Sequence, residues 1–214
     1  RAELALQCLQ SLVAQPFEKY EIIIIDNEST DETPKLFNRL TGNVRVLVNN
    51  ENKGFLHACN QGAKYAISPY LLFLNNDTVV IGNSIGLGVQ TLDKEKDAGA
   101  VGGRLVLPGG RLQEAGSFID SEGSCHGYGR NGFPSSSEFM FQRDVDYCSG
   151  AFLMTRRDLH CSLKGFDSNY KPAYYEEVDY CVRVWKSGYR VIYDPRILIL
   201  HHEFASSANR EDAI

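Results

Sequence analysis

The chain has 214 residues, of which 43% are hydrophobic and 23% are charged, and its formal net charge at pH 7 is −5. Enough apolar side chains are present to bury a full core, which excludes a disordered chain and favours one globular domain, residues 1–214, carrying an insertion. The negative charge provides no broad basic field and makes nucleic acid a poor partner, and the longest apolar runs are far shorter than the ~20 residues of a membrane-spanning helix.

Helical and strand patterns alternate through the first part of the chain. The unbroken isoleucine run at 22–25 is typical of a strand covered on both faces of a parallel sheet, and Thr33 followed by Pro34 marks the start of a helix. The predicted elements, in chain order, are a helix around residues 5–12, strand 20–27, helix 33–40, strand 44–48, helix 54–66 and strand 70–77. This alternation predicts an α/β fold with a central, mostly parallel sheet flanked by helices.

The pattern changes after about residue 101. Paired and single glycines punctuate residues 102–144, which predicts an insertion or an irregular β region. No P-loop motif is present, and GYGRNG at 127–132 matches a dinucleotide-binding fingerprint without a strand before it or a helix after it. Both P-loop nucleotidases and dinucleotide dehydrogenases are therefore disfavoured. The elements predicted after this region are strand 146–155, a helix at about 156–163, an acidic helix starting near 176, and strands 189–194 and 197–202.

Residues 174–181, YYEEVDYC, place three acidic side chains at the start of the acidic helix. A helix N-terminus favours carboxylates even on a solvated surface, because its first N–H groups are unpaired. The apolar stripe of this helix predicts that Glu177 lies next to the buried face, whereas Glu176 and Asp179 fall on a more exposed side, with Asp179 paired to Arg183. A carboxylate placed like that of Glu177 suits a general base that takes a proton from an attacking hydroxyl group.

Polar side chains also follow two of the predicted strands. Asp77 comes directly after Asn75 and Asn76, and a carboxylate there suits a hard divalent cation, although Asn and Asp are also common in turns. His201 and His202 end the last strand, with one side chain on each face. The histidine that faces Asp77 would complete a site of the Mn²⁺ type.

Successive blocks of the chain resemble family 2 glycosyltransferases, which are inverting enzymes with the GT-A fold. The blocks are EIIIIDNESTDET (21–33), ENKGFLHACNQG (51–62), YLLFLNNDTVV (70–80), DYCSGAFLMTRRDL (146–159), GFDSNYKPAYYEEVDYCVRVWKSGYRVIYDP (165–195) and HHEFASS (201–207). The chain particularly resembles bacterial members, often called rhamnosyltransferase-like, that build O-antigen, capsule and other surface polysaccharides. The resemblance implies a nucleotide-binding half at 1–101, an acceptor and catalytic half at 145–214, and a first strand of the fold that precedes Arg1 and is missing.

The resemblance also implies roles for individual residues. The NND sequence at 75–77 is similar to the family's metal motif without its first carboxylate, so Asp77 would bind a divalent cation, Mn²⁺ or Mg²⁺, with His201 as a further ligand. Glu177 matches the catalytic base, and Glu176 would hold the site or the acceptor. The residues implied to bind the nucleotide-sugar are Asp26, Asn27, Ser29, Asn52, Gly54, Asn60 and Asn76.

The implied reaction is one in-line displacement at the anomeric carbon of a nucleotide-diphosphate sugar, with inversion, onto a saccharide or lipid-linked saccharide acceptor of a bacterial surface polysaccharide. Two alternatives stay open: a sugar-1-phosphate nucleotidyltransferase, which shares a similar α/β core, and a catalytically degenerate domain that only binds carbohydrate or a partner. Six cysteines without a paired or zinc-ligand spacing favour reduced thiols and a cytoplasmic location. Peripheral association with the inner face of the membrane, through the parent protein, is left open.

Overall fold

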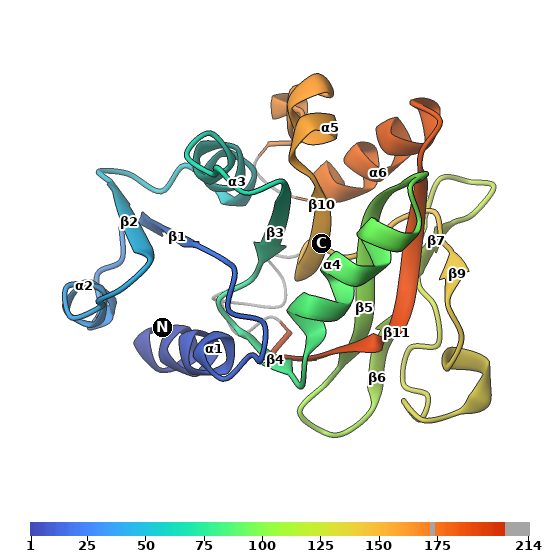
Figure 1. Cartoon of the computed structure of the whole chain (residues 1–214), viewed down its shortest axis with the longest axis horizontal. Coiled ribbons are helices and arrows are strands. Elements are labelled where there is room, and N and C mark those ends of the chain that lie inside the picture. Colours follow the sequence, from blue (N-terminus) through green and yellow to red (C-terminus); the bar gives the residue numbers. More distant parts are fainter. Residues whose placement is uncertain (172–173, 204–214) are drawn as a thin grey trace.

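The computed structural model describes residues 1–171 and 174–203 (Figure 1). Its helices are Ala2–Val13 (α1), Thr33–Phe37 (α2), Phe55–Ala63 (α3), Ser84–Lys94 (α4), Arg157–Ser162 (α5) and Glu176–Lys186 (α6), with 3-10 helices at Ser137–Phe139 (η1) and Ser168–Tyr170 (η2). Its strands are Ile22–Asn27 (β1), Val44–Asn49 (β2), Tyr70–Leu74 (β3), Thr78–Ile81 (β4), Ala98–Val106 (β5), Leu112–Ala115 (β6), Ser117–Ile119 (β7), Cys125–Gly127 (β8), Arg143–Asp144 (β9), Phe152–Arg156 (β10) and Arg190–His201 (β11). The predicted α/β class is confirmed.

The main sheet is mixed rather than parallel. Among the described residues it has seven strands in the order β3-β10-β5-β11-β4, with β6 beside β5 and β9 beside β11. Strands β5 and β11 run parallel, whereas the other described pairs in this sheet are antiparallel. The prediction of a mostly parallel central sheet is therefore wrong, because β10 enters between β3 and β5 in the opposite direction and β4 runs antiparallel to β11.

Strands β1 and β2 pair in parallel as a sheet of their own. Figure 1 shows this blue pair set apart from the large sheet, with α2 beyond it and α1 below it. Helix α3 packs on β1, and α1 packs on β4, so helices rather than strand pairing connect the small sheet to the rest of the fold.

The main sheet has an apolar core on each face. Consecutive strand residues alternate between the two cores, as Ala100 and Val101 of β5 show. One core packs against α3, α5 and α6, and the other packs against α1 and α4, which lies over the sheet in Figure 1. All six cysteines are free thiols, and Cys148 and Cys181 belong to the first core. None of the described helices is long and apolar enough to cross a membrane.

Strand β11 ends at His201, beside the start of β4. The sequence predicts two strands here, and the structure has one, whose pairing with β5 shifts register between Tyr193 and Leu198. At this shift the two strands pack closely. A Cβ atom on Gly103 would lie 2.3 Å from Cγ2 of Ile197 and 2.8 Å from its carbonyl oxygen, so only glycine fits. This close contact helps to position the part of β11 that leads to His201.

The range predicted as an insertion, residues 102–144, includes the second half of β5, all of β6 and all of β9, which are strands of the main sheet. A third apolar cluster, of Leu112, Ala115, Phe139 and Tyr193, packs η1 against β6. Glu114 pairs with Leu105 and Leu112 pairs with Val106, so Gln113 is an extra residue in β6, a β-bulge. All four residues of β6 are buried, although two of them are polar.

Candidate active site

Polar residues after β1 and β2 form a hydrogen-bonded group at the start of α3. Asp26 is 3% exposed, and its Oδ1 accepts a hydrogen bond from the backbone N–H of Ser29 at 2.9 Å. Asn27 donates through Nδ2 to the carbonyl of Gly54 at 3.2 Å, and Oδ1 of Asn52 accepts from the N–H of Gly54 at 3.0 Å. Gly54 has a left-handed φ of 78°. The structure thus brings these five predicted nucleotide-sugar residues together beyond the carboxyl end of β1, where ligands bind in α/β sheets.

Asn60 lies inside α3 and contacts a different segment. Its Nδ2 donates to the carbonyl of Phe166 at 2.8 Å, and its Oδ1 accepts from the N–H of the same residue at 2.9 Å. Asn60 therefore ties α3 to the segment before α6, and its contact with a nucleotide stays a prediction. Asn76 is exposed in the turn between β3 and β4, next to Asp77.

Asp77 and His201 face each other where β4 begins and β11 ends. Asp77 is 4% exposed and His201 is 6% exposed, and Oδ1 of Asp77 lies 3.3 Å from Nε2 of His201. The backbone fixes the pair, because Thr78 pairs with His201 across the sheet and the N–H of His202 donates to the carbonyl of Asp77 at 2.9 Å. A carboxylate oxygen and an imidazole nitrogen at this separation fit neighbouring positions around a Mn²⁺-type ion. Within the described residues, no group of three or more His, Cys, Asp and Glu side chains is arranged to hold a metal.

The other ring nitrogen of His201 contacts a residue that the sequence analysis missed. Nδ1 of His201 lies 2.7 Å from Oε1 of Gln113, and both side chains are buried. Gln113 sits in the segment predicted as an insertion, and the only signal that could have found it is a polar pair inside a short apolar strand.

Helix α6 begins at Glu176 after two residues with left-handed backbone. Tyr174 has a φ of 76° and Tyr175 a φ of 69°, which is uncommon for residues other than glycine. Glu176 is 4% exposed, and burial raises the pKa of its carboxyl group. The prediction that Glu176 lies on an exposed side is therefore wrong, because the chain entering α6 turns this side chain inward. The predicted pair of Asp179 and Arg183 is confirmed, at 2.7 Å.

Glu177 is half-buried and has like-charged neighbours. Burial first, and then the charges of Glu176 and Glu114, raise the pKa of Glu177 from 4.5 to about 7, against the lowering effect of hydrogen bonds from its own N–H and that of Gly150. A carboxyl group with this pKa is partly ionised at neutral pH and suits proton transfer in either direction.

Glu114 is a second acid that the sequence analysis missed. It is 7% exposed, and its Oε1 accepts from the N–H of Ser149 at 3.3 Å. The next N–H along the chain, that of Gly150, donates a hydrogen bond to Glu177, so two consecutive backbone amides bind two carboxyl groups. Burial raises the pKa of Glu114, while hydrogen bonds from the amide of Ser149 and the side chain of Ser117 lower it. Strand β6 therefore links the two halves of the site, with Gln113 on the Asp77 side and Glu114 on the Glu177 side.

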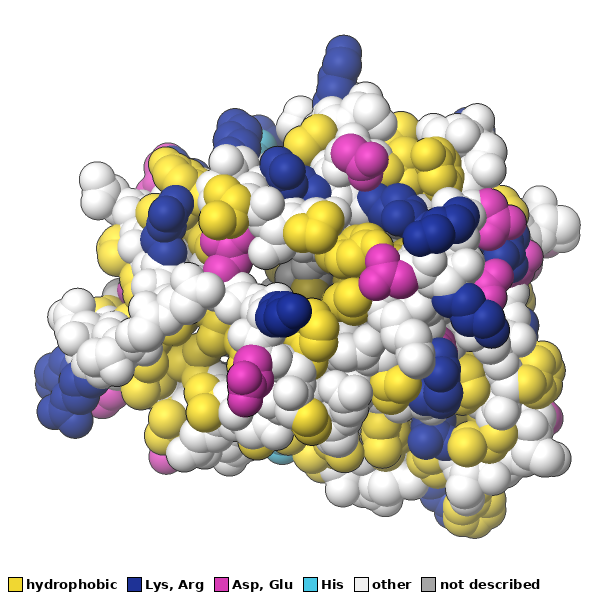
Figure 2. Space-filling view, in the orientation of Figure 1, with side chains coloured by type: hydrophobic (Ala, Val, Ile, Leu, Met, Phe, Trp, Pro, Cys, Tyr) yellow, Lys and Arg dark blue, Asp and Glu magenta, His cyan; other side chains and the backbone are white. Residues whose placement is uncertain are grey.

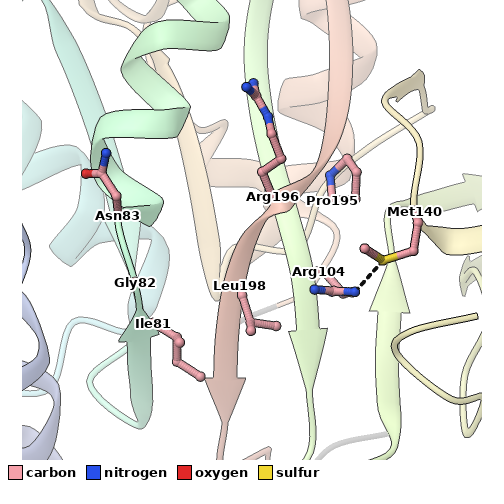
Figure 3. A pocket seen from close by; sticks show the side chains of 8 residues that line it. All are labelled: Ile81, Gly82, Asn83, Arg104, Met140, Pro195, Arg196 and Leu198. Carbon is pink, nitrogen blue, oxygen red and sulfur yellow. Dashed lines mark hydrogen bonds between the residues drawn. The ribbon is translucent and has the colours of Figure 1, made fainter.

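A cavity of about 270 Å³ lies elsewhere and contains none of these residues. Its lining side chains, shown in Figure 3, are Ile81, Gly82, Asn83, Arg104, Met140, Pro195, Arg196 and Leu198. Ile81 pairs with Leu198 three residues along β4 from the pairing of Thr78 with His201, so this cavity is ~10 Å from the Asp77 and His201 pair at the ~3.3 Å rise of a strand.

Charged side chains on the surface are largely interspersed. On the face in Figure 2, Lys and Arg side chains are scattered among acidic and apolar ones. Arg190 illustrates the pairing, since its guanidinium lies within 3.0 Å of carboxylate oxygens of Glu95, Asp97 and Asp144.

The sequence of the chain is similar to those of known proteins. The sequence profile described as Glycosyl transferase family 2 matches residues 1–162, a range that includes Asp26, Asp77 and Gln113 but ends before α6. The O-antigen biosynthesis protein RfbC of Myxococcus xanthus is 30% identical over 223 residues, covering 100% of this chain and 17% of that protein. The N-acetylglucosaminyl-diphospho-decaprenol L-rhamnosyltransferase of Mycobacterium tuberculosis is 29% identical over 231 residues, covering 96% of this chain and 73% of that enzyme.

Solved structures show a similar fold. The structure of GalNAc-T7 with UDP, GalNAc and Mn²⁺ has a TM-score of 0.74 at 17% identity and covers 90% of this chain and 40% of that one. The mannosyltransferase PcManGT of Pyrobaculum calidifontis, in complex with GDP-Man and Mn²⁺, has a TM-score of 0.69 at 18% identity and covers 94% of this chain and 54% of that one. These likenesses identify the GT-A fold, and the expected missing first strand stays a prediction. The chain spans about a fifth of the length of the first curated relatives it matches, which it covers to 22% and 17%.

Proposed function

Because the chain belongs to glycosyl transferase family 2, we propose that it moves a sugar from a nucleotide-diphosphate sugar to a hydroxyl group of an acceptor, with inversion at the anomeric carbon. The observation that carries the proposal is Glu177, a half-buried residue whose carboxyl pKa is raised to about 7; β6 connects its surroundings, through Glu114 and Gln113, to His201 and Asp77. Family membership provides the class of reaction, and this arrangement provides residues that can perform it.

Glu177 acts as the general base. The oxygen of the acceptor hydroxyl forms a bond to the anomeric carbon while the bond from that carbon to the diphosphate oxygen breaks. The hydroxyl proton moves to the carboxylate of Glu177, which the N–H of Gly150 orients. Glu176, 4% exposed beside it, holds the acceptor side of the site and keeps the pKa of Glu177 high by its charge. The products are a glycosylated acceptor and a nucleoside diphosphate.

Asp77 and His201 would hold the divalent cation, Mn²⁺ or Mg²⁺. When bound, this ion supplies positive charge that offsets the charge of the departing diphosphate. The loop of Asp26, Asn27 and Ser29 holds the nucleoside, because its polar atoms are already fixed by hydrogen bonds beyond the end of β1. Asn76, exposed in the next turn, lies beside the nucleotide.

The acceptor is a saccharide or lipid-linked saccharide of a bacterial surface polysaccharide. Two relatives support this class by their printed names, one an O-antigen biosynthesis protein and the other a rhamnosyltransferase named for a diphospho-decaprenol acceptor. The reaction then takes place in the cytoplasm or at the inner face of the membrane.

Calorimetric titration of UDP, GDP and dTDP, each with and without Mn²⁺, tests the proposal. We expect one diphosphate to bind only with the ion, to lose affinity in Asp77→Ala and to keep it in Glu177→Gln. Product analysis with the matching nucleotide-sugar then separates the alternatives: nucleoside diphosphate indicates a glycosyltransferase, and pyrophosphate indicates a nucleotidyltransferase. If no diphosphate binds and no donor is consumed, the chain is a binding domain and the proposal is wrong.

A further inference from the structure

Gln113 has no role in the reaction as proposed, yet its side-chain oxygen lies 2.7 Å from Nδ1 of His201, one of the two residues proposed to bind the metal ion. We propose that Gln113 is a positioning residue that fixes His201 in the orientation and tautomer in which Nε2 binds the metal ion. This inference rests on the proposed function, because it assumes that Asp77 and His201 hold a cation. It goes beyond that function by assigning a determinant of metal affinity to the segment between β5 and β7.

The contact is specific and buried. Oε1 of Gln113 lies 2.7 Å from Nδ1 of His201, and the two side chains are 5% and 6% exposed. An amide oxygen can only accept a hydrogen bond, so Nδ1 carries the ring hydrogen and Nε2 presents a lone pair. Nε2 lies 3.3 Å from Oδ1 of Asp77. Two acceptor atoms this close together are stabilised by a cation bound to both.

The backbone of β6 is shaped to make this contact. Glu114 and Leu112 pair with consecutive residues of β5, which leaves Gln113 as the extra residue of a β-bulge. A bulge interrupts the alternation of side chains and redirects one of them, and bulges are common beside active sites. Here the redirected side chain is the amide that reaches His201. A regular β6 strand would form one more residue pair with β5 and lose the contact between Gln113 and His201. The bulge is therefore the feature of the backbone that makes this contact possible.

Metal-binding histidines generally donate the hydrogen of the second ring nitrogen to an acceptor, and removal of that acceptor weakens metal binding. Gln113→Leu keeps the size of the side chain and removes the acceptor, so the ring of His201 is free to change tautomer. We expect the dissociation constant for Mn²⁺ to rise by about 10- to 100-fold. Gln113→Glu keeps an acceptor oxygen at the same place and should retain the affinity.

Binding of Mn²⁺ is measured by the electron paramagnetic resonance signal of the free ion, in the presence of the nucleoside diphosphate that binds the wild type. Gln90→Leu, the same change at an exposed glutamine of α4, is the matched control and should bind Mn²⁺ like the wild type. Equal affinities of Gln113→Leu and wild type would overturn this inference while leaving the proposed function intact. Wild-type protein that binds no Mn²⁺, or that keeps its affinity in Asp77→Ala, would overturn both the metal site and this inference.

A second measurement does not depend on metal and covers the case in which Gln113→Leu folds poorly. Nitrogen-15 chemical shifts report which ring nitrogen of a histidine carries the hydrogen, and His201→Asn identifies the signal among the five histidines of the chain. In metal-free wild type at mildly alkaline pH we expect the hydrogen on Nδ1 of His201, and in Gln113→Glu the same. A hydrogen on Nε2, bonded to Asp77, in the wild type would refute the assignment.

Discussion

The raised pKa of Glu177 predicts that the residue proposed as the base costs the protein stability. An acid whose pKa is higher in the folded state than in the unfolded chain is held protonated by the fold, so its ionisation favours unfolding. The stability that the protonated form provides is complete below about pH 4.5 and is lost as the pH rises through about 7. Glu177→Gln replaces the acid by a neutral side chain of the same shape. The variant should therefore be inactive and more stable than the wild type at pH 8.

The size of the gain follows from the two pKa values. A rise from 4.5 to about 7 corresponds to at most about 3.5 kcal/mol, at ~1.4 kcal/mol for each pKa unit. Relaxation of Glu176 and Glu114 in the ionised state reduces this value, so we expect about 2 kcal/mol at pH 8 and no gain near pH 4. For a domain of this size, 1 kcal/mol changes the melting temperature by about 2–4 °C, which predicts a melting temperature higher by about 4–8 °C at pH 8.

Thermal unfolding followed by circular dichroism, at several pH values from 4 to 8, measures the difference. Glu122→Gln, which removes an exposed carboxylate from the turn between β7 and β8, is the control and should melt like the wild type at each pH. A Glu177→Gln variant that melts at or below the wild-type temperature at pH 8 would show that the carboxyl group is not destabilised by burial. A gain that is the same at pH 4 and pH 8 would show that its origin is not ionisation.

Three further outcomes are expected. The kcat/KM of the wild type should rise with pH through about 7 as Glu177 ionises. Glu114→Gln removes a neighbouring negative charge and should therefore move this rise in kcat/KM to lower pH. A folded Glu114→Gln variant with an unchanged pH profile would show that Glu114 does not affect the pKa of Glu177. Asn60→Ala should lower the free energy of unfolding by about 2 kcal/mol in chemical denaturation, because two backbone groups of Phe166 lose their hydrogen-bond partner. A variant with unchanged stability but weaker nucleotide binding would instead assign Asn60 to the nucleotide pocket. Gly103→Ala should lower the free energy of unfolding by about 1–3 kcal/mol, whereas Gly109→Ala, whose added Cβ meets nothing within 4 Å, should be nearly neutral in the same measurement.

Local patterns in the sequence identified much of the first half of the fold. The isoleucine run became β1, the Thr33 and Pro34 pair lies at the start of α2, and Asp77 and His201 meet as the strand-end argument requires. These predictions hold because they depend on the chemistry of neighbouring residues and on the position of strand ends. Strand direction does not depend on such patterns, since β10 is as apolar as a parallel strand and still runs antiparallel to both of its neighbours.

The sequence patterns failed where the backbone departs from regular periodicity. Glu176 is buried because Tyr174 and Tyr175 adopt left-handed backbone before α6, which helical periodicity does not reveal. Gln113 and Glu114 are both buried because a β-bulge interrupts the alternation of β6. These site residues thus lie where the backbone departs from helical or strand periodicity. Their positions depend on long-range contacts, such as that of Gln113 with a histidine 88 residues away, which local sequence patterns do not reveal.

The separation of β1 and β2 from the main sheet affects local opening of the structure. A two-stranded sheet held mainly by helices opens more readily than a strand inside a seven-stranded one, so its amide hydrogens should exchange with solvent sooner than those of β5 or β10. Asp26 and Asn27 belong to the two-stranded sheet, while Asp77 lies at the edge of the seven-stranded one. A ligand that contacts both sheets restricts their relative motion, and this loss of conformational freedom lowers the net binding free energy. Slower exchange across β1 and β2 on nucleotide binding would be the visible sign of it.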